Sequence, residues 1–207
     1  MGATFSRPLR KLAHISGGLP LLLLPLFVDG LPETVVAYLL GSLYLVFFLW
    51  VAAFPRPVAR LFHRLVKPGE AEQGLRGASA YFFVLSADLL ILAPLVGLKP
   101  AALAGMMLTF GDGFSALVGR REAPTWPWNP SKTIWGSVGF VIFTSLAWLT
   151  FLGLAGYPLT TRLALVSLVA ALVGALLESL PLEDVLDDNL VVGLGGMVLA
   201  TLAVGML

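Results

Sequence analysis

Residues 111–121, with the sequence GDGFSALVGRR, include the residue types that a metal or nucleotide site requires. Asp112 stands at the end of an apolar segment between two glycines, which let backbone amides or phosphate oxygens approach closely. A carboxylate in this setting can be a ligand for Mg²⁺ or a base for a reacting hydroxyl group. The structural alternative is an acid at a helix end that pairs with Arg120 or Arg121. The pattern favours the metal or catalytic role.

Two groups of cations have the character of phosphate-binding residues. Lys132 follows a short polar loop and precedes small residues at the start of another apolar segment, where its ammonium group is a point charge. Arg10, Lys11 and His14 stand together at the start of the first apolar segment. Phosphate capture is one interpretation, and anchoring of the chain at a membrane interface is the other. The small residues after Lys132 favour phosphate capture there, whereas the pattern around Arg10 alone favours anchoring.

The connection between the last two apolar segments is densely acidic. Glu178 ends one segment, and further acids follow before the next, namely Glu183, Asp184, Asp187 and Asp188. Because like charges this close repel one another, a divalent metal or distant arginines would relieve the repulsion. A solvated acidic loop is the alternative. Asp88 is separate from this group, since it lies inside an apolar segment, where an ionisable residue is a functional candidate by default.

Membrane-crossing helices must position these residues. The chain has 207 residues, a mean hydropathy of +0.92 and 12% charged residues, whereas soluble domains average about 25%. Segments close to the span length of about 20 apolar residues lie at roughly 14–31, 34–54, 78–98, 100–118, 134–155, 162–180 and 190–207. The first contains glycines and prolines, so we expect it to be kinked or partly re-entrant. The sequence predicts an all-α, polytopic membrane helix bundle of about seven transmembrane helices, with residues 1–207 as a single domain.

Composition also excludes several classes of site. The chain has no cysteine, which excludes disulfides, thiolate catalysis and cysteine metal sites. Its only histidines are His14 and His63, which argues against a histidine-rich zinc centre. A net charge of +1 without a basic tail gives no indication of nucleic-acid binding. The basic N-terminal region and the apolar run after it lack a cleavage site, so we expect an uncleaved first helix.

The basic residues predict the orientation of the chain. With seven spans, all of the 13 lysines and arginines except Lys99 and Arg162 fall on one side. Because positively charged loops stay in the cytoplasm, we expect a cytoplasmic N-terminus and an external C-terminus. Most acids map to the same side. The chemistry is therefore expected at the cytoplasmic face of the cell (inner) membrane, where soluble nucleotides are available.

Four blocks of residues, taken in order, resemble a known family. They are Arg10-Lys11-x-x-His14, Gly111-Asp112-Gly113 with Gly119-Arg120, Lys132-Thr133-x-x-Gly136-Ser137, and Glu178-Ser179 with Asp187-Asp188-Asn189. Over roughly residues 7–200 the chain resembles the polyprenol kinase family, which includes phytol kinase, dolichol kinase and a CTP-dependent diacylglycerol kinase. The likeness is greatest to phytol kinase-like bacterial members. One departure is Trp135, which stands where family members often have an acid.

The resemblance implies CTP-dependent phosphorylation of the hydroxyl group of a membrane isoprenoid alcohol, with Mg²⁺ as cofactor. It implies catalytic roles for Asp112, Lys132 and Glu178. The nucleotide-binding residues it implies are Arg10, Lys11, Gly111, Gly113, Gly119, Arg120 and Thr133. The metal ligands would be drawn from Asp112, Glu178, Asp187 and Asp188.

Two other functions stay open at the level of the sequence. One is a CTP-dependent cytidylyltransferase that acts on a lipid phosphate such as phosphatidate. The other is an ion- or proton-coupled transporter with Asp88 as its site. The sequence does not name the alcohol among phytol, geranylgeraniol, farnesol, longer polyprenols and diacylglycerol. It also leaves the role of Asp112 open between metal ligand and base, and it is compatible with a homo-oligomer.

Overall fold

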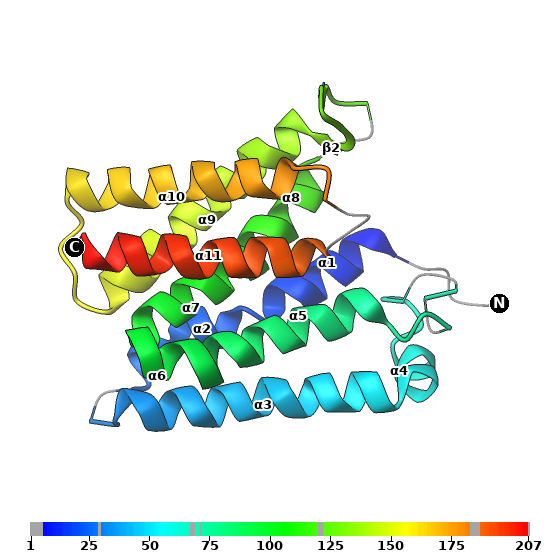
Figure 1. Ribbon diagram of the computed structural model, residues 1–207, viewed down its shortest axis with the longest axis horizontal. Coiled ribbons are helices and arrows are strands. Elements are labelled where there is room, and N and C mark those ends of the chain that lie inside the picture. The colour runs from blue at the N-terminus through cyan, green and yellow to red at the C-terminus, as the bar shows by residue number, and fades with distance from the viewer. Residues whose placement is uncertain are drawn as a thin grey trace.

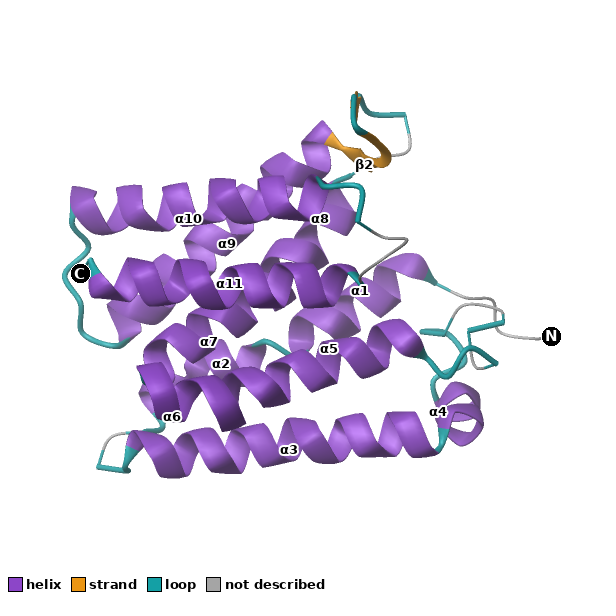
Figure 2. Cartoon of the chain, in the orientation of Figure 1, coloured by secondary structure: helices purple, strands orange, loops and turns teal. Residues whose placement is uncertain are grey.

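Helices make up nearly all of the structure, a computed structural model that describes residues 6–28, 30–66, 69–70, 72–119, 122–182 and 187–206. Most run along one common direction, with a short hairpin at one end (Figure 1, Figure 2). This confirms the predicted all-α membrane bundle. The elements are α1 (Arg7–Ser16), α2 (Leu19–Leu23), η1 (Leu24–Leu26), α3 (Glu33–Ala53), α4 (Pro55–Leu61), α5 (Arg76–Ala87), η2 (Asp88–Leu92), α6 (Ala93–Val96), α7 (Leu98–Met106), η3 (Met107–Asp112), α8 (Gly113–Val118), β1 (Thr125–Trp126), β2 (Asn129–Thr133), α9 (Ile134–Leu154), α10 (Thr161–Ser179) and α11 (Asp188–Gly205).

Six helical stretches of the described chain are long and apolar enough to cross a membrane. They correspond to the last six predicted segments, and they are Glu33–Ala53, Arg76–Val96, Leu98–Val118, Ile134–Leu154, Thr161–Ser179 and Asp188–Gly205. The first predicted segment, 14–31, forms short pieces instead of one helix. α1 ends at the Gly17 cap, and Pro20 and Pro25 stand in the first turns of α2 and η1, where a missing backbone N–H costs nothing. Where we expected a kink in the first segment, the helix is therefore completely interrupted between α1, α2 and η1.

The broken segment nevertheless makes a passage along the bundle. α1 begins and α11 ends at opposite ends of the molecule (Figure 1). Six long stretches alone would bring the chain back to the end where it started. The α1–α2–η1 segment therefore accounts for a seventh passage. We call the end where α1, α5, α9 and α11 begin the charged end.

The stretch Leu98–Val118 is the central helix of the bundle. Every residue from 100 to 111 is buried. Small residues such as Ala101, Ala104 and Gly105 let the neighbouring helices approach closely. Its regular α-helix changes to the wider π-helical η3 at 107–112, a feature that often marks functional sites. The central helix therefore holds Asp112 in a fixed position at the charged end.

Candidate functional site

Asp112 lies where η3 passes into α8, and α1 supplies its partners. Its Oδ2 accepts a hydrogen bond from Nζ of Lys11 at 2.9 Å, and Nε2 of His14 is 3.4 Å from the same oxygen. Lys11 and His14 are three residues apart on one helix face, so both reach this carboxylate. Among the described residues, no side chain or backbone group donates a hydrogen bond to Oδ1. The alternative partners Arg120 and Arg121 lie outside the described residues.

Close packing fixes α1 against the central helix. A Cβ added at Gly113 would collide with Ile15 of α1, so the two backbones approach as only glycine allows. Tyr81 of α5 donates a hydrogen bond to the His14 carbonyl oxygen at 2.8 Å, and its ring centroid is 4.1 Å from that of His14. Tyr81 was not predicted from the sequence, which contains no signal that pairs it with α1. The contacts leave Lys11 and His14 little freedom to move away from Asp112.

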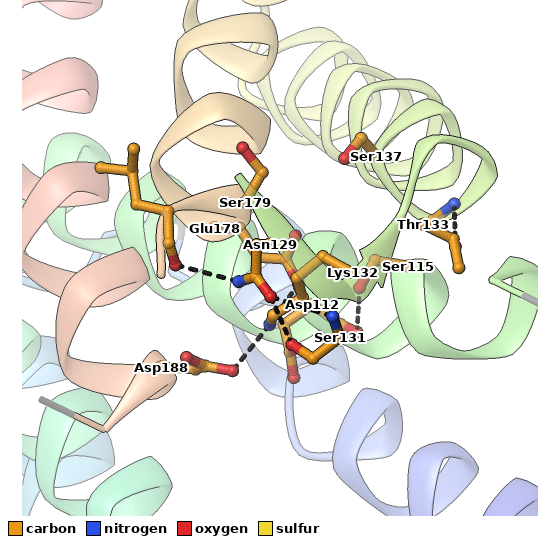
Figure 3. A network of polar contacts seen from close by, with 12 residues as sticks. Asp112, Ser115, Asn129, Ser131, Lys132, Thr133, Ser137, Glu178, Ser179 and Asp188 are labelled. Carbon is orange, nitrogen blue, oxygen red and sulfur yellow. Dashed lines mark hydrogen bonds and ion pairs between the residues drawn. The ribbon is translucent and has the colours of Figure 1, made fainter. Parts of the chain in front are cut away.

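Lys132 forms a second charged cluster beside Asp112 (Figure 3). Its Nζ is 2.7 Å from Oε1 of Glu178 at the end of α10 and 2.7 Å from Oδ2 of Asp188 at the start of α11. Burial alone would lower the pKa of Lys132, but the two carboxylates raise it above its ordinary value. The amine therefore stays charged at neutral pH. The structure thus brings together three predicted residues that are far apart in sequence.

The β1–β2 hairpin positions Lys132. Nε1 of Trp126 donates a hydrogen bond to Oγ of Ser137 at 2.9 Å, which ties the hairpin to α9. Nε1 of Trp128 donates to Oγ of Ser179 at 3.3 Å, which ties it to α10. The two indole rings stack with centroids 4.6 Å apart. These contacts of the two tryptophans fix the hairpin that carries Lys132 against α9 and α10.

Several predicted nucleotide-binding residues have packing roles in the structure. Oγ1 of Thr133 accepts a hydrogen bond from the Gly136 amide at 3.1 Å and so caps α9. A Cβ added at Gly119 would lie 2.7 Å from that same Oγ1. A Cβ added at Gly111 would lie 2.7 Å from the Phe140 ring. These contacts explain why glycine and threonine stand at these positions without reference to a ligand, and their nucleotide role stays a prediction.

Arg10 makes an ion pair that the sequence analysis missed. Its guanidinium group binds both carboxylate oxygens of Glu70, with an Nη2–Oε1 distance of 2.8 Å. A two-pronged pair of this kind fixes orientation as well as charge. Glu70 belongs to the connection between α4 and α5, which also contains Arg64, Lys67 and Glu72. The sequence contains no signal that pairs Glu70 with Arg10.

Asp187 precedes α11, and Asn189 lies in the first turn of that helix. Oδ1 of Asp187 accepts hydrogen bonds from the backbone amide and the side chain of Asn189, at 2.9 and 2.8 Å. The Asn189 side chain also donates to the Gly77 carbonyl oxygen at 3.2 Å, which joins α11 to α5. Asp187 therefore acts as a helix cap. Glu183 and Asp184 lie outside the described residues.

A cavity of about 510 Å³ connects these clusters. One wall is polar and is formed by Arg10, Lys11, His14, Glu70, Asp112, Asp187, Asp188 and Asn189. The rest of the lining is mainly apolar, and we call it the apolar wall; it is formed by Phe47, Trp50, Val51, Val58, Phe62, Leu65, Val66, Leu75, Ala78 and Phe82. Lys132 and Glu178 do not line the cavity. The apolar wall comes from α3, α4, α5 and the connection between α4 and α5, where the sequence analysis placed no site residue.

The carboxylates of the site suit a metal ion only if a bound phosphate compound supplies further oxygen ligands. Among the described residues, no three Asp, Glu, His or Cys side chains gather as a metal site. Glu178 and Asp188 share Lys132, whereas Asp112 pairs with Lys11. A Mg²⁺ ion that arrives with phosphates needs only one or two protein carboxylates. Asp112, Asp187 and Asp188 all line the cavity and fit that requirement.

Asp88 lies away from this site. It is 1% exposed in η2, and neither of its carboxylate oxygens has a hydrogen-bond partner among the described residues. Its Oδ2 faces the central helix, since a Cβ added at Gly105 would lie 3.8 Å from it. Asp88 does not line the cavity.

Comparison with known proteins identifies plant relatives. Phytol kinase 1, chloroplastic, from Arabidopsis thaliana is 34% identical over 72% of this chain and 50% of its own length. Farnesol kinase, chloroplastic, from the same species is 29% identical over 90% of this chain and 62% of its own length. Probable phytol kinase 1, chloroplastic, from Oryza sativa subsp. japonica is 30% identical over 95% of this chain and 64% of its own length.

These relatives are plant proteins rather than the bacterial members that the motifs led us to expect. The chain spans between half and just under two thirds of their length. No family model matches the chain, and no solved structure matches it. The similarity to the phytol and farnesol kinases extends over most of the chain. The chain therefore belongs to the polyprenol kinase family.

Proposed function

We propose that this protein transfers the terminal phosphoryl group of CTP to the hydroxyl group of a membrane isoprenoid alcohol, as a single catalytic domain. The main support is the mixed lining of the cavity, which combines charged side chains with a larger set of apolar ones. An isoprenoid alcohol has the same division, with one hydroxyl group on a long apolar chain. The names of the plant relatives point to alcohols of this class.

The apolar wall suits the isoprenoid chain. Phe47, Trp50 and Phe82 contribute large apolar surfaces, and no charged residue belongs to the part of the wall from α3. Burial of the isoprenoid chain against the apolar wall removes the surface of the isoprenoid from water and supplies binding energy. The hydroxyl group would then lie at the junction of the two walls, close to Asp112. This arrangement orients the alcohol for reaction.

Asp112 is our candidate for the base. Lys11 and His14 hold Oδ2, whereas Oδ1 has no partner among the described residues. In the proposed reaction the alcohol oxygen forms a bond to the terminal phosphorus of the nucleotide. The bond from that phosphorus to its bridging oxygen breaks, and a nucleoside diphosphate leaves. The hydroxyl proton passes to Oδ1 of Asp112.

The cations of the charged end suit the nucleotide. Arg10 and Lys11 line the polar wall, and Lys132 lies behind Asp188 at the same end. Phosphoryl transfer depends mainly on positioning and on neutralisation of phosphate charge. A bound Mg²⁺, held by Asp187 or Asp188 together with the phosphates, would add to that neutralisation. The choice of CTP and Mg²⁺ rests on the family resemblance, and the cytoplasmic position rests on the distribution of basic residues.

A transfer assay tests this proposal. Purified protein in liposomes receives CTP labelled at its γ-phosphate, Mg²⁺ and a panel of isoprenoid alcohols, with ATP, GTP and UTP as competitors. We expect label on the alcohol, and CDP as the second product. Label released as pyrophosphate in the presence of phosphatidate would instead support a cytidylyltransferase. No turnover with any pair would turn attention to transport and Asp88.

The variant Asp112→Asn tests the base. It keeps the size of the side chain but removes its ability to take a proton, so we expect turnover to fall by about a thousandfold, in the range of lost acid–base catalysis. Asp88→Asn is the matched control, because it makes the same change at a buried aspartate that lines no part of the cavity. Near-normal turnover of Asp112→Asn in folded protein would refute the assignment.

A further inference from the structure

A second cavity lies beside the first, on the outer surface of the bundle. It has a volume of about 480 Å³ and lies between α1 and residues 61–65, at the end of α4 and just after it. Leu9, Leu12 and Leu61 are part of its wall, and they are 41%, 55% and 64% exposed. Ser16, His63 and Arg64 also line it. The second cavity therefore combines exposed leucines, which are compatible with lipid chains, with three polar residues.

Three residues line both cavities, namely Ala13 of α1 together with Phe62 and Leu65. All three are apolar, and Phe62 is 39% exposed although it also faces the inner cavity. Their side chains are therefore the boundary between the outer cavity and the apolar wall of the inner one. We call these three residues the boundary.

Polar contacts at the charged end hold the two sides of the boundary together. The backbone amide of Ser6, at the start of α1, donates a hydrogen bond to the Arg64 carbonyl oxygen at 2.9 Å. The Arg10–Glu70 ion pair joins α1 to the same connection. No hydrogen bond joins the side chains of the boundary, which are all apolar, so their size determines how much space is left between the two cavities.

We propose that the alcohol reaches the active-site cavity sideways from the bilayer, between α1 and residues 62–65, and that the boundary selects which chains pass. This inference rests on the proposed kinase function. A route through the polar wall would draw the isoprenoid chain past Arg10, Lys11 and Glu70 and expose its surface to water. The sideways route takes the isoprenoid chain past the leucines of the outer cavity and the apolar boundary, and the polar residues beside it are Ser16, His63 and Arg64. Phe62, Leu65 and Ala13 thereby become specificity-determining residues.

The activity test compares two alcohols that differ in their need for the route. Geranylgeraniol is supplied within the vesicle membrane, and dimethylallyl alcohol, which is short and water-soluble, is supplied in solution. The substitution Ala13→Phe should narrow the route and lower the ratio of geranylgeraniol to dimethylallyl alcohol turnover by about tenfold. Phe62→Ala should widen it and raise that ratio for branched or bulkier chains. An unchanged ratio in both variants would overturn the proposal.

Two control substitutions match these changes in size. Phe54→Ala removes an exposed phenylalanine that precedes α4, and Ala52→Phe adds a ring at an exposed position of α3. Neither residue lines either cavity. Both controls should leave the ratio of the two turnovers unchanged. A control that moves the ratio as far as the boundary variants do would also count against the route.

A labelling experiment tests the route without any need for activity. The chain has no native cysteine, so Leu65→Cys provides one reactive group at the boundary and Phe54→Cys provides one away from it. Geranylgeraniol in the membrane should slow maleimide labelling of the first variant several-fold and leave the second unaffected. If geranylgeraniol slows labelling of Leu65→Cys but the protein shows no turnover, the result supports the route and contradicts the kinase function. If the protein shows turnover but geranylgeraniol does not slow the labelling, the result contradicts the route and supports the kinase function.

Discussion

Lys132 holds two carboxylates whose charges would otherwise repel. One of them, Glu178, has a side chain that is only 5% exposed, so its charge cannot be relieved by water. Removing one member of a buried ion pair is costly because the remaining charge stays buried and unpaired. The lysine therefore supports the join between β2, α10 and α11 as well as any phosphate.

We expect Lys132→Met to lower the free energy of unfolding by about 3 kcal/mol, the size found when a buried pair is broken. Thermal unfolding in detergent would measure it. Lys99→Met is the matched control, because the Lys99–Glu33 pair at the other end is 3.6 Å long, with side chains 37% and 50% exposed. Its loss should cost less than about 1 kcal/mol. Equal effects of the two changes would contradict the structural role of Lys132.

The central helix is the element on which the site depends. It must bring Asp112 to the charged end and also accept α1 at contact distance. Gly113 makes the second condition possible, since a Cβ there would collide with Ile15. The same approach places Lys11 and His14 against the carboxylate of Asp112.

We expect Gly113→Ala to push α1 away, to destabilise the protein by about 2 kcal/mol and to reduce turnover more than stability alone explains. The control is Gly205→Ala near the end of α11, where an added Cβ meets nothing within 4 Å. That change should leave both quantities nearly unaltered. Melting temperature and turnover, measured together, check the prediction. If Gly113→Ala changed neither the melting temperature nor the turnover, α1 would not need this contact.

The long elements could be predicted from the sequence, and the cavity could not. Apolar length alone located six of the seven passages, because a span is a local property of the chain. The break in the first passage was visible only as a concentration of glycine and proline. Glu70 and Tyr81 were missed because their partners, Arg10 and His14, are 60 and 67 residues away in sequence. The apolar wall was missed because Phe47 and Trp50 look like ordinary membrane-facing residues until α4 and α5 are placed beside them.

At the scale of the whole molecule, the odd number of passages separates the two ends of the chain. Gln73 is an exposed residue at the charged end, and Arg162 is an exposed residue at the start of α10, at the opposite end. In a cysteine-free chain, each can be replaced to report which side of the membrane it occupies. This property makes the predicted orientation directly measurable.

We expect a membrane-impermeant maleimide to label Gln73→Cys only from the cytoplasmic side and Arg162→Cys only from the outside. The reason is the concentration of lysines and arginines at the charged end, which stay on the cytoplasmic side. Labelling of intact cells and of inverted vesicles gives the two measurements. Labelling of both variants from one side would contradict seven passages. Exchange of the two sides would reverse the predicted orientation.

The two walls of the cavity come from different parts of the chain. The apolar wall, where we propose that the isoprenoid chain binds, is built by α3, α4, α5 and the connection between α4 and α5, whereas most of the polar wall comes from α1, the central helix and α11. Substitutions in the first group can alter the shape of the apolar wall without touching Asp112 or its partners. Selection for a new alcohol could therefore proceed in one region while the phosphate chemistry was inherited intact. An ancestral protein of this architecture could diversify in substrate by small steps, each of which left a working catalyst.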